Sequence, residues 1–209
     1  KAHYLSLRGE SAGALLRGFS NLANLQINEN GAYQIFGTDY AQYMKADFDF
    51  RAYIPVNSTD RIAYRLFAGV GVPYKNSQSM PFVRRYFCGG SYSIRGWQPR
   101  AIGPGSSIDT SGFVFPMQTG DMKLEGSVEY RFQLVGKLEG AMFIDAGNVW
   151  NLRQDDPQGS IFGKNFYDQI AVGSGLGFRY DFSFFVLRFD MGLKTRDPSA
   201  EKGHHWPMF

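Results

Sequence analysis

The stretch MKLEGSVEYRFQL, residues 122–134, alternates strictly between two kinds of side chain. Its even positions are Met122, Leu124, Gly126, Val128, Tyr130, Phe132 and Leu134, and its odd positions are Lys123, Glu125, Ser127, Glu129, Arg131 and Gln133. Successive side chains of a β-strand point to opposite faces, so the stretch predicts a strand with one apolar and one ionic face. It exceeds the roughly 5 to 6 residues usual in a sandwich strand and suffices for the roughly 9 to 11 that cross a membrane at a tilt.

The same alternation recurs along the chain. Residues 41–54 and 61–72 show it most clearly, and further strands are predicted at 3–9, 137–149, 167–181 and 184–194. The connections at 55–60, 135–136 and 182–183 are short, whereas those at 10–40, 73–121 and 150–166 are long. Short turns at one end and long loops at the other are typical of outer-membrane barrels. The predicted fold is therefore all-β, an antiparallel transmembrane β-barrel, with one short helix over residues 11–25.

Seven strands are an odd number, whereas bacterial single-chain barrels close with an even number. We therefore expect residues 1–209 to be one partial membrane β-barrel domain, a fragment without its closing strand or any domain upstream. The composition agrees with strands and turns, because aromatic residues make up 16% and glycines number 25. A formal charge of +3 gives no reason to expect a nucleic-acid partner. No apolar run approaches the roughly 20 residues of a membrane-spanning helix.

The long connection, residues 73–121, contains the most specific motif. Its centre, RRYFCGGSYSIRGW (residues 84–97), resembles the loop motif of the BamA/TamA family of bacterial outer-membrane assembly factors, also called the bacterial surface antigen barrel. That motif is a pair of glycines followed by [V/I]-R-G-[F/Y/W], and here it consists of Gly89, Gly90, Ile94, Arg95, Gly96 and Trp97. The resemblance continues downstream through EGSVEYRF (125–132), FIDAGNVW (143–150), GSGLGFRYDF (173–182) and LRFDMGLKTRDP (187–198).

The resemblance implies the C-terminal part of a 16-stranded barrel whose long loop folds back into the lumen and places its arginine against acidic residues of the wall. Strand parity agrees, because Glu129 and Asp145 both fall on the ionic faces of their strands. A planar guanidinium bonds two carboxylates at fixed angles, which a lysine cannot reproduce. We therefore predict that Arg95 binds Glu129 and Asp145, with Gly96 permitting a tight turn and Trp97 burying an aromatic ring. The alternative is a solvated loop arginine.

Other candidate sites are weaker. The glycines of residues 173–177 alternate along a strand with no helix after them, so a phosphate loop is not expected. His204 and His205 lack cysteine or acidic partners at ligand spacing, so no metal is expected. Cys88 is interpreted as a small loop residue, although neighbouring Arg84 and Arg85 would lower the pKa of a reactive thiol. With no nucleophile beside a base, we expect no catalytic residues and no enzyme.

Three functions from different classes remain. The first, implied by the resemblance, is an insertase that promotes folding or translocation of other outer-membrane or surface proteins. Its partners would be outer-membrane lipids, unfolded outer-membrane clients, upstream periplasmic (POTRA) domains and accessory assembly proteins, with no cofactor. The second is a two-partner-type secretion pore, and the third is a plain outer-membrane channel. Each places the chain in the bacterial outer membrane as a multi-pass protein.

Overall fold

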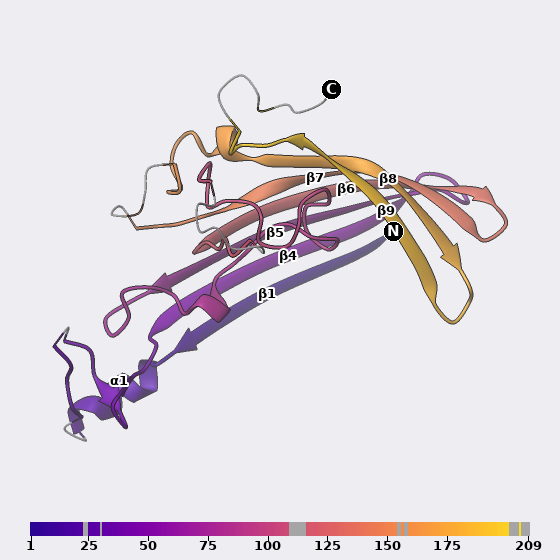
Figure 1. The fold of residues 1–209 in the computed structure, drawn as a ribbon. Helices are drawn as coiled ribbons and strands as arrows, with labels where there is room; N and C mark the ends of the chain where they lie inside the picture. Colours follow the sequence, from indigo (N-terminus) through magenta and orange to yellow (C-terminus); the bar gives the residue numbers. More distant parts are fainter. Residues whose placement is uncertain are drawn as a thin grey trace.

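The computed structural model describes residues 1–22, 25–29, 31–108, 116–153, 156, 159–200 and 205, and in them one antiparallel sheet has the strand order β1-β4-β5-β6-β7-β8-β9 (Figure 1). Its strands are β1 (Ala2–Ala12), β4 (Tyr43–Pro55), β5 (Arg61–Pro73), β6 (Met122–Val135), β7 (Leu138–Trp150), β8 (Ala171–Asp181) and β9 (Val186–Arg196). The smaller elements are α1 (Ala14–Leu22), the hairpin of β2 (Gln34–Ile35) with β3 (Thr38–Asp39), and 3-10 helices at Phe82–Arg84 and Phe166–Gln169. None of the helices described is long and apolar enough to span a membrane.

One face of the sheet is apolar and exposed. Tyr130, Met142, Leu176 and Met191 form a continuous row across β6, β7, β8 and β9 and are 36%, 53%, 47% and 49% exposed. A soluble sandwich would cover such a face with a second sheet, whereas a membrane barrel turns it toward lipid. The predicted class, an antiparallel sheet of the membrane-barrel type, is confirmed.

The opposite, concave face carries the charged residues and is covered by the chain between β5 and β6 (Figure 1). The buried apolar cluster lies there, between this connection and the sheet, and consists of Tyr86, Cys88, Ile94, Trp97, Ile102, Val149 and Ala171. All of these residues except Val149 and Ala171 belong to this connection. The core is therefore made when the loop docks on the sheet.

The strand predictions are confirmed in number and order, but several bounds are wrong. Strand β1 extends through Ala12, so the helix starts at Ala14 rather than at residue 11. A 3-10 helix, Phe166–Gln169, occupies the predicted start of β8. The turn before β9 is longer than predicted, because Phe182 N–H donates to Phe185 O at 3.0 Å. The β2–β3 hairpin was not predicted, since strands this short show no periodicity.

Candidate functional site

The connection of residues 74–121, called the inner loop here, is closed by backbone pairing near its base. The N–H groups of Tyr86 and Gly120 each donate to the other residue's carbonyl at 2.9 Å. The Tyr86 hydroxyl also donates to the carboxylate of Asp47 on β4. Burial, and then this hydrogen bond, raise the pKa of the Tyr86 phenol far above its usual value. The Tyr86 ring needs Gly69 beneath it, because a Cβ at that position would lie 2.6 Å from ring carbons.

Residues 90–97, called the tip, form a tight closed turn at the far end of the inner loop. Gly90 N–H donates to Trp97 O at 2.9 Å. Gly89, Gly90 and Gly96 have φ values of +99°, +94° and +97°, which L side chains rarely adopt. The motif glycines thus produce the backbone path that turns Arg95 toward the sheet.

Arg95 is 7% exposed, and its guanidinium bonds two strands at once. Nε and Nη2 donate to the two carboxylate oxygens of Asp145 on β7 at 2.6 and 2.8 Å, and the backbone N–H adds a third bond at 3.1 Å. Nη1 donates to Glu129 Oε2 on β6 at 2.6 Å. The guanidinium carbon also lies 3.3 Å from the ring centre of Phe143. The structure thus brings together the three charged residues that sequence analysis grouped.

Burial disfavours the charge on Arg95, but its bonds to Asp145 and Glu129 outweigh burial and hold its pKa above the usual value. The surrounding charges alternate in sign. Glu129 also accepts from Arg131 Nε at 2.5 Å and from Arg179 Nη2 at 2.9 Å. Asp190 of β9 lies 3.3 Å from Arg95 Nη1. Arg179 and Asp190 were not predicted as site residues, although both occupy inward positions of alternating strands.

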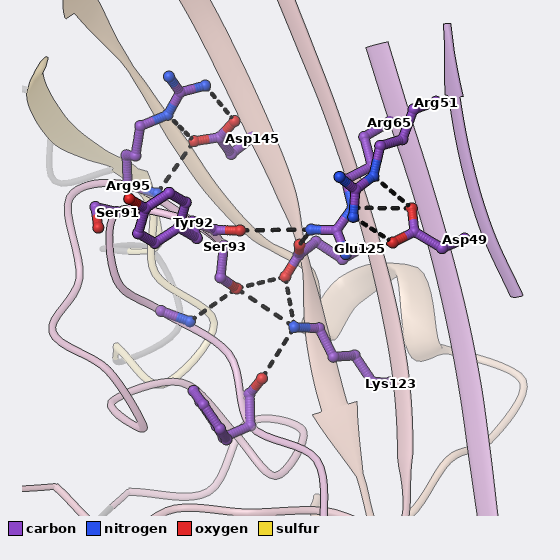
Figure 2. A network of polar contacts seen from close by, with 12 residues as sticks. Asp49, Arg51, Arg65, Ser91, Tyr92, Ser93, Arg95, Lys123, Glu125 and Asp145 are labelled. Atoms are coloured by element: carbon purple, nitrogen blue, oxygen red, sulfur yellow. Dashed lines mark hydrogen bonds and ion pairs between the residues drawn. The ribbon is translucent and has the colours of Figure 1, made fainter. Parts of the chain in front are cut away.

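A second polar network holds the tip on β5 and β6 (Figure 2). The Ser93 hydroxyl donates to the Glu125 carboxylate, which also accepts from Lys123 at 2.7 Å and from Arg65 at 3.1 Å. Arg65 Nη1 further donates to the backbone carbonyl of Tyr92 at 3.4 Å. This network was not predicted, although Lys123 and Glu125 lie on the ionic face of the alternating stretch at residues 122–134.

Apolar residues of the motif complete the docking. Ile94 is fully buried and Trp97 is 6% exposed, and both pack in the cluster that contains Cys88. Burial raises the pKa of the Cys88 thiol to about 12. The two nearby arginines have other partners: Arg85 pairs with Asp121 at 3.2 Å and Arg84 with Glu10 at 3.7 Å. The structure therefore contradicts a thiol activated by these arginines.

Within the residues that the structure describes, no group of three His, Cys, Asp or Glu side chains is placed to hold a metal ion. His204 lies outside the described residues. The ring Nδ1 of His205 lies 3.2 Å from the backbone carbonyl of Asp197.

The fold and the docked loop define part of a β-barrel of the outer-membrane type. Residues 5–206 match the model of the Omp85 superfamily domain, and the chain belongs to this superfamily. The resemblance to BamA-type proteins is confirmed, and the chain corresponds to their barrel portion.

Two curated relatives share 26% identity with the chain. One is a SAM50-like protein of Schizosaccharomyces pombe, aligned over 75% of this chain and 33% of the relative. The other is the outer membrane protein assembly factor BamA of Neisseria meningitidis serogroup B, aligned over 64% of this chain and 17% of the relative. The chain thus spans a third or less of the curated relatives that it matches.

Two solved structures align with this chain, to different degrees. The crystal structure of BamA from Haemophilus ducreyi lacking POTRA domains 1–3 has a TM-score of 0.56 at 17% identity, and the match covers 91% of this chain and 47% of that one. CdiB from Acinetobacter baumannii has a TM-score of 0.46 at 19% identity over 74% of this chain and 24% of that one. The BamA likeness shows that the curved sheet has the fold of part of that structure.

Proposed function

We propose that residues 1–209 are a partial barrel domain of an insertase, a factor that promotes folding of other outer-membrane proteins in a bacterial outer membrane. The superfamily match supports this function, as does the BamA relative, whose name is outer membrane protein assembly factor. The observation that carries it is the docking of Arg95 on Asp145 and Glu129, with Asp190 3.3 Å away. A plain channel has no need of a loop bonded to its inner wall.

The proposed mechanism is physical and needs no cofactor. An incoming client strand pairs with unpaired backbone groups at a strand edge of the barrel, because such an edge is a template for pairing. This edge must be presented in a fixed geometry while the wall beside it stays closed. By bonding β6 and β7 together, the Arg95 side chain fixes the curvature of that wall from the inside. The docked inner loop is thus a brace for the edge that receives clients.

The proposed partners follow from this mechanism. The apolar outer face binds outer-membrane lipids, and unfolded outer-membrane proteins are the clients. Periplasmic POTRA domains in the same protein and accessory assembly proteins would deliver those clients. We favour 16 strands for the complete barrel and no catalytic activity for it.

The test is client folding in lipid vesicles that contain the full-length protein. We expect the wild type to accelerate folding of an unfolded outer-membrane protein, and Arg95→Ala and Arg95→Lys to lose most of that acceleration, about tenfold, because neither side chain can bond two carboxylates. Arg61→Ala is the matched control, since Arg61 bonds Glu139 at 2.7 Å on the same wall, away from the tip. Vesicles that leak ions without accelerating folding would contradict the insertase and favour a secretion pore or channel.

A further inference from the structure

Besides its bonds to the carboxylates of β6 and β7, the tip lies directly on the backbone of β8 and β9. A Cβ at Gly192 of β9 would lie 2.6 Å from Gly96 N and 2.9 Å from the carbonyl carbon of Arg95. A Cβ at Gly173 of β8 would lie 2.1 Å from Arg95 O. Neither distance is possible for a real Cβ, and the atoms in the way are backbone. These two glycines therefore form a socket that only the absence of side chains creates.

The contact is reciprocal. A Cβ on Gly96 of the tip would lie 2.9 Å from the carbonyl carbon of Leu193 and 3.2 Å from Lys194 N. The tip and β9 thus approach backbone to backbone, each with a glycine facing the other. The register of β8 and β9 shifts between Val172 and Gly173, at the place where Gly173 receives the Arg95 carbonyl. The irregularity in the sheet therefore coincides with the socket.

Charged groups of β9 hold both sides of the tip. Asp190 Oδ2 lies 3.3 Å from Arg95 Nη1, and Arg188 Nη2 donates to the carbonyl of Ser91 at 3.4 Å. The ammonium of Lys194 lies 5.5 Å from the ring centre of Trp97. Within the described residues β9 pairs with one strand, β8. The tip thus supports β9 in addition to this pairing.

We propose that Gly173, Gly192 and Asp190 are positioning residues of the inner loop, and that docking of the tip and the position of β9 depend on each other. The tip cannot leave Asp145 and Glu129 without also leaving β9, and a displaced β9 releases the tip. The inner loop is in this way coupled to the strand farthest from β1 in the sheet, beyond the two strands that Arg95 bonds directly. The inference rests on the proposed function only in what the coupling serves.

The chain contains its own reporter of docking. Cys88 is fully buried against Ile94 and Trp97, and it is the only cysteine of the sequence. A thiol reagent reaches it only when the tip leaves the sheet. The experiment measures the rate of Cys88 labelling in the full-length protein folded in lipid vesicles. The variants are Gly192→Ala and Asp190→Asn. The control is Gly9→Ala on β1, where a Cβ meets nothing within 4 Å.

We expect Gly192→Ala to label roughly tenfold faster than wild type or more, because the added methyl meets fixed backbone. Asp190→Asn, which keeps size and removes charge, should accelerate labelling by a smaller factor. Gly9→Ala should stay within about twofold of wild type, as surface substitutions usually do. Labelling of Gly192→Ala at the wild-type rate would overturn the proposal, as would equal acceleration by Gly9→Ala.

A double variant separates loss of docking from damage to β9 itself. If Gly192→Ala acts through the tip, the double variant with Arg95→Ala should label Cys88 only slightly faster than the faster of the two single variants, because the tip has already left the sheet. If the rate increases of the two single variants instead multiply in the double variant, the two substitutions act independently and the coupling is overturned. Client folding is measured on the same samples. Faster labelling with unchanged client folding would contradict the proposed function and leave the coupling standing, whereas unchanged labelling overturns the coupling whatever the folding rate.

Discussion

Arg95 and Arg179 donate to the same oxygen atom, Glu129 Oε2, at 2.6 and 2.9 Å. One arginine belongs to the inner loop and the other to β8, so a single carboxylate joins the loop to the wall. The other oxygen of Glu129 accepts from Arg131. Asp145, by contrast, forms its side-chain hydrogen bonds with Arg95. The two carboxylates that hold Arg95 therefore differ in how many cations depend on them.

This difference predicts unequal losses of stability. Glu129→Gln leaves three guanidinium groups short of a charged partner, and we expect it to lower the free energy of unfolding by about 3 to 5 kcal/mol. Asp145→Asn leaves one guanidinium, Arg95, which keeps Glu129, and should cost less. Urea unfolding in lipid vesicles, followed by tryptophan fluorescence, measures both. Glu139→Gln is the control, because Glu139 is partly exposed and bonds Arg61. Equal losses for Glu129→Gln and Asp145→Asn would contradict the shared role of Glu129.

Gly96→Ala should undock the tip. The added Cβ combines a backbone φ of +97° with a 2.9 Å approach to the carbonyl carbon of Leu193. Gly136→Ala is the matched control, since its φ is +56° and a Cβ at that position would meet nothing within 4 Å. The control should lose only about 1 kcal/mol, from backbone strain. Labelling of Cys88 should be much faster in Gly96→Ala than in the control. Similar rates in the two variants would show that the contact of Gly96 with β9 does not hold the tip.

Labelling of Cys88 should require undocking of the tip, and docking should weaken at high pH. Burial raises the pKa of its thiol from 9.0 to about 12, so the docked thiol is protonated at pH 8. Because the folded pKa is raised, docking is fully stable below pH 9 and weakens as pH rises from about 9 toward 12. Labelling of the folded protein at pH 8 should be slower than that of the urea-unfolded protein by roughly a hundredfold or more, because the reagent reaches the thiol only while the tip is off the sheet. A difference below tenfold would refute a buried thiol.

Removal of the Ser93 hydroxyl should have a smaller effect than removal of Arg95. Glu125 keeps its bonds to Lys123 and Arg65 when Ser93 is replaced. The Ser93 hydroxyl also accepts from Gly89 N–H at 3.2 Å, and we expect Ser93→Ala to weaken docking by about 1 kcal/mol, within the net range of neutral hydrogen bonds. That corresponds to a roughly fivefold faster labelling of Cys88. An effect as large as that of Arg95→Ala would mean that the second network, not the arginine, holds the tip.

Sequence alone was enough to predict the strands because each long segment shows its two faces in its own alternation, as residues 122–134 do. Parity on two strands and the family motif also grouped Arg95 with Glu129 and Asp145. Asp190 and Arg179 could not be added in this way. Which inward-facing groups meet depends on the register between strands, and the shift at Gly173 is not visible in the periodicity of either strand. The contact of Gly173 and Gly192 with the tip could not be predicted either, because nothing in a sequence shows what packs against a glycine.

The paired base of the inner loop keeps the tip close to its site on the sheet. The two hydrogen bonds between Tyr86 and Gly120 lie outside residues 90–97, so the tip can leave the sheet while the base stays paired. A released tip remains tethered beside its site at an effective concentration of about millimolar, as short linkers provide. Recapture is then a local search by a short segment, and closure of such loops takes roughly 10 to 100 ns. A tip that has left the sheet would therefore close again unaided, like a latch that stays on its hinge.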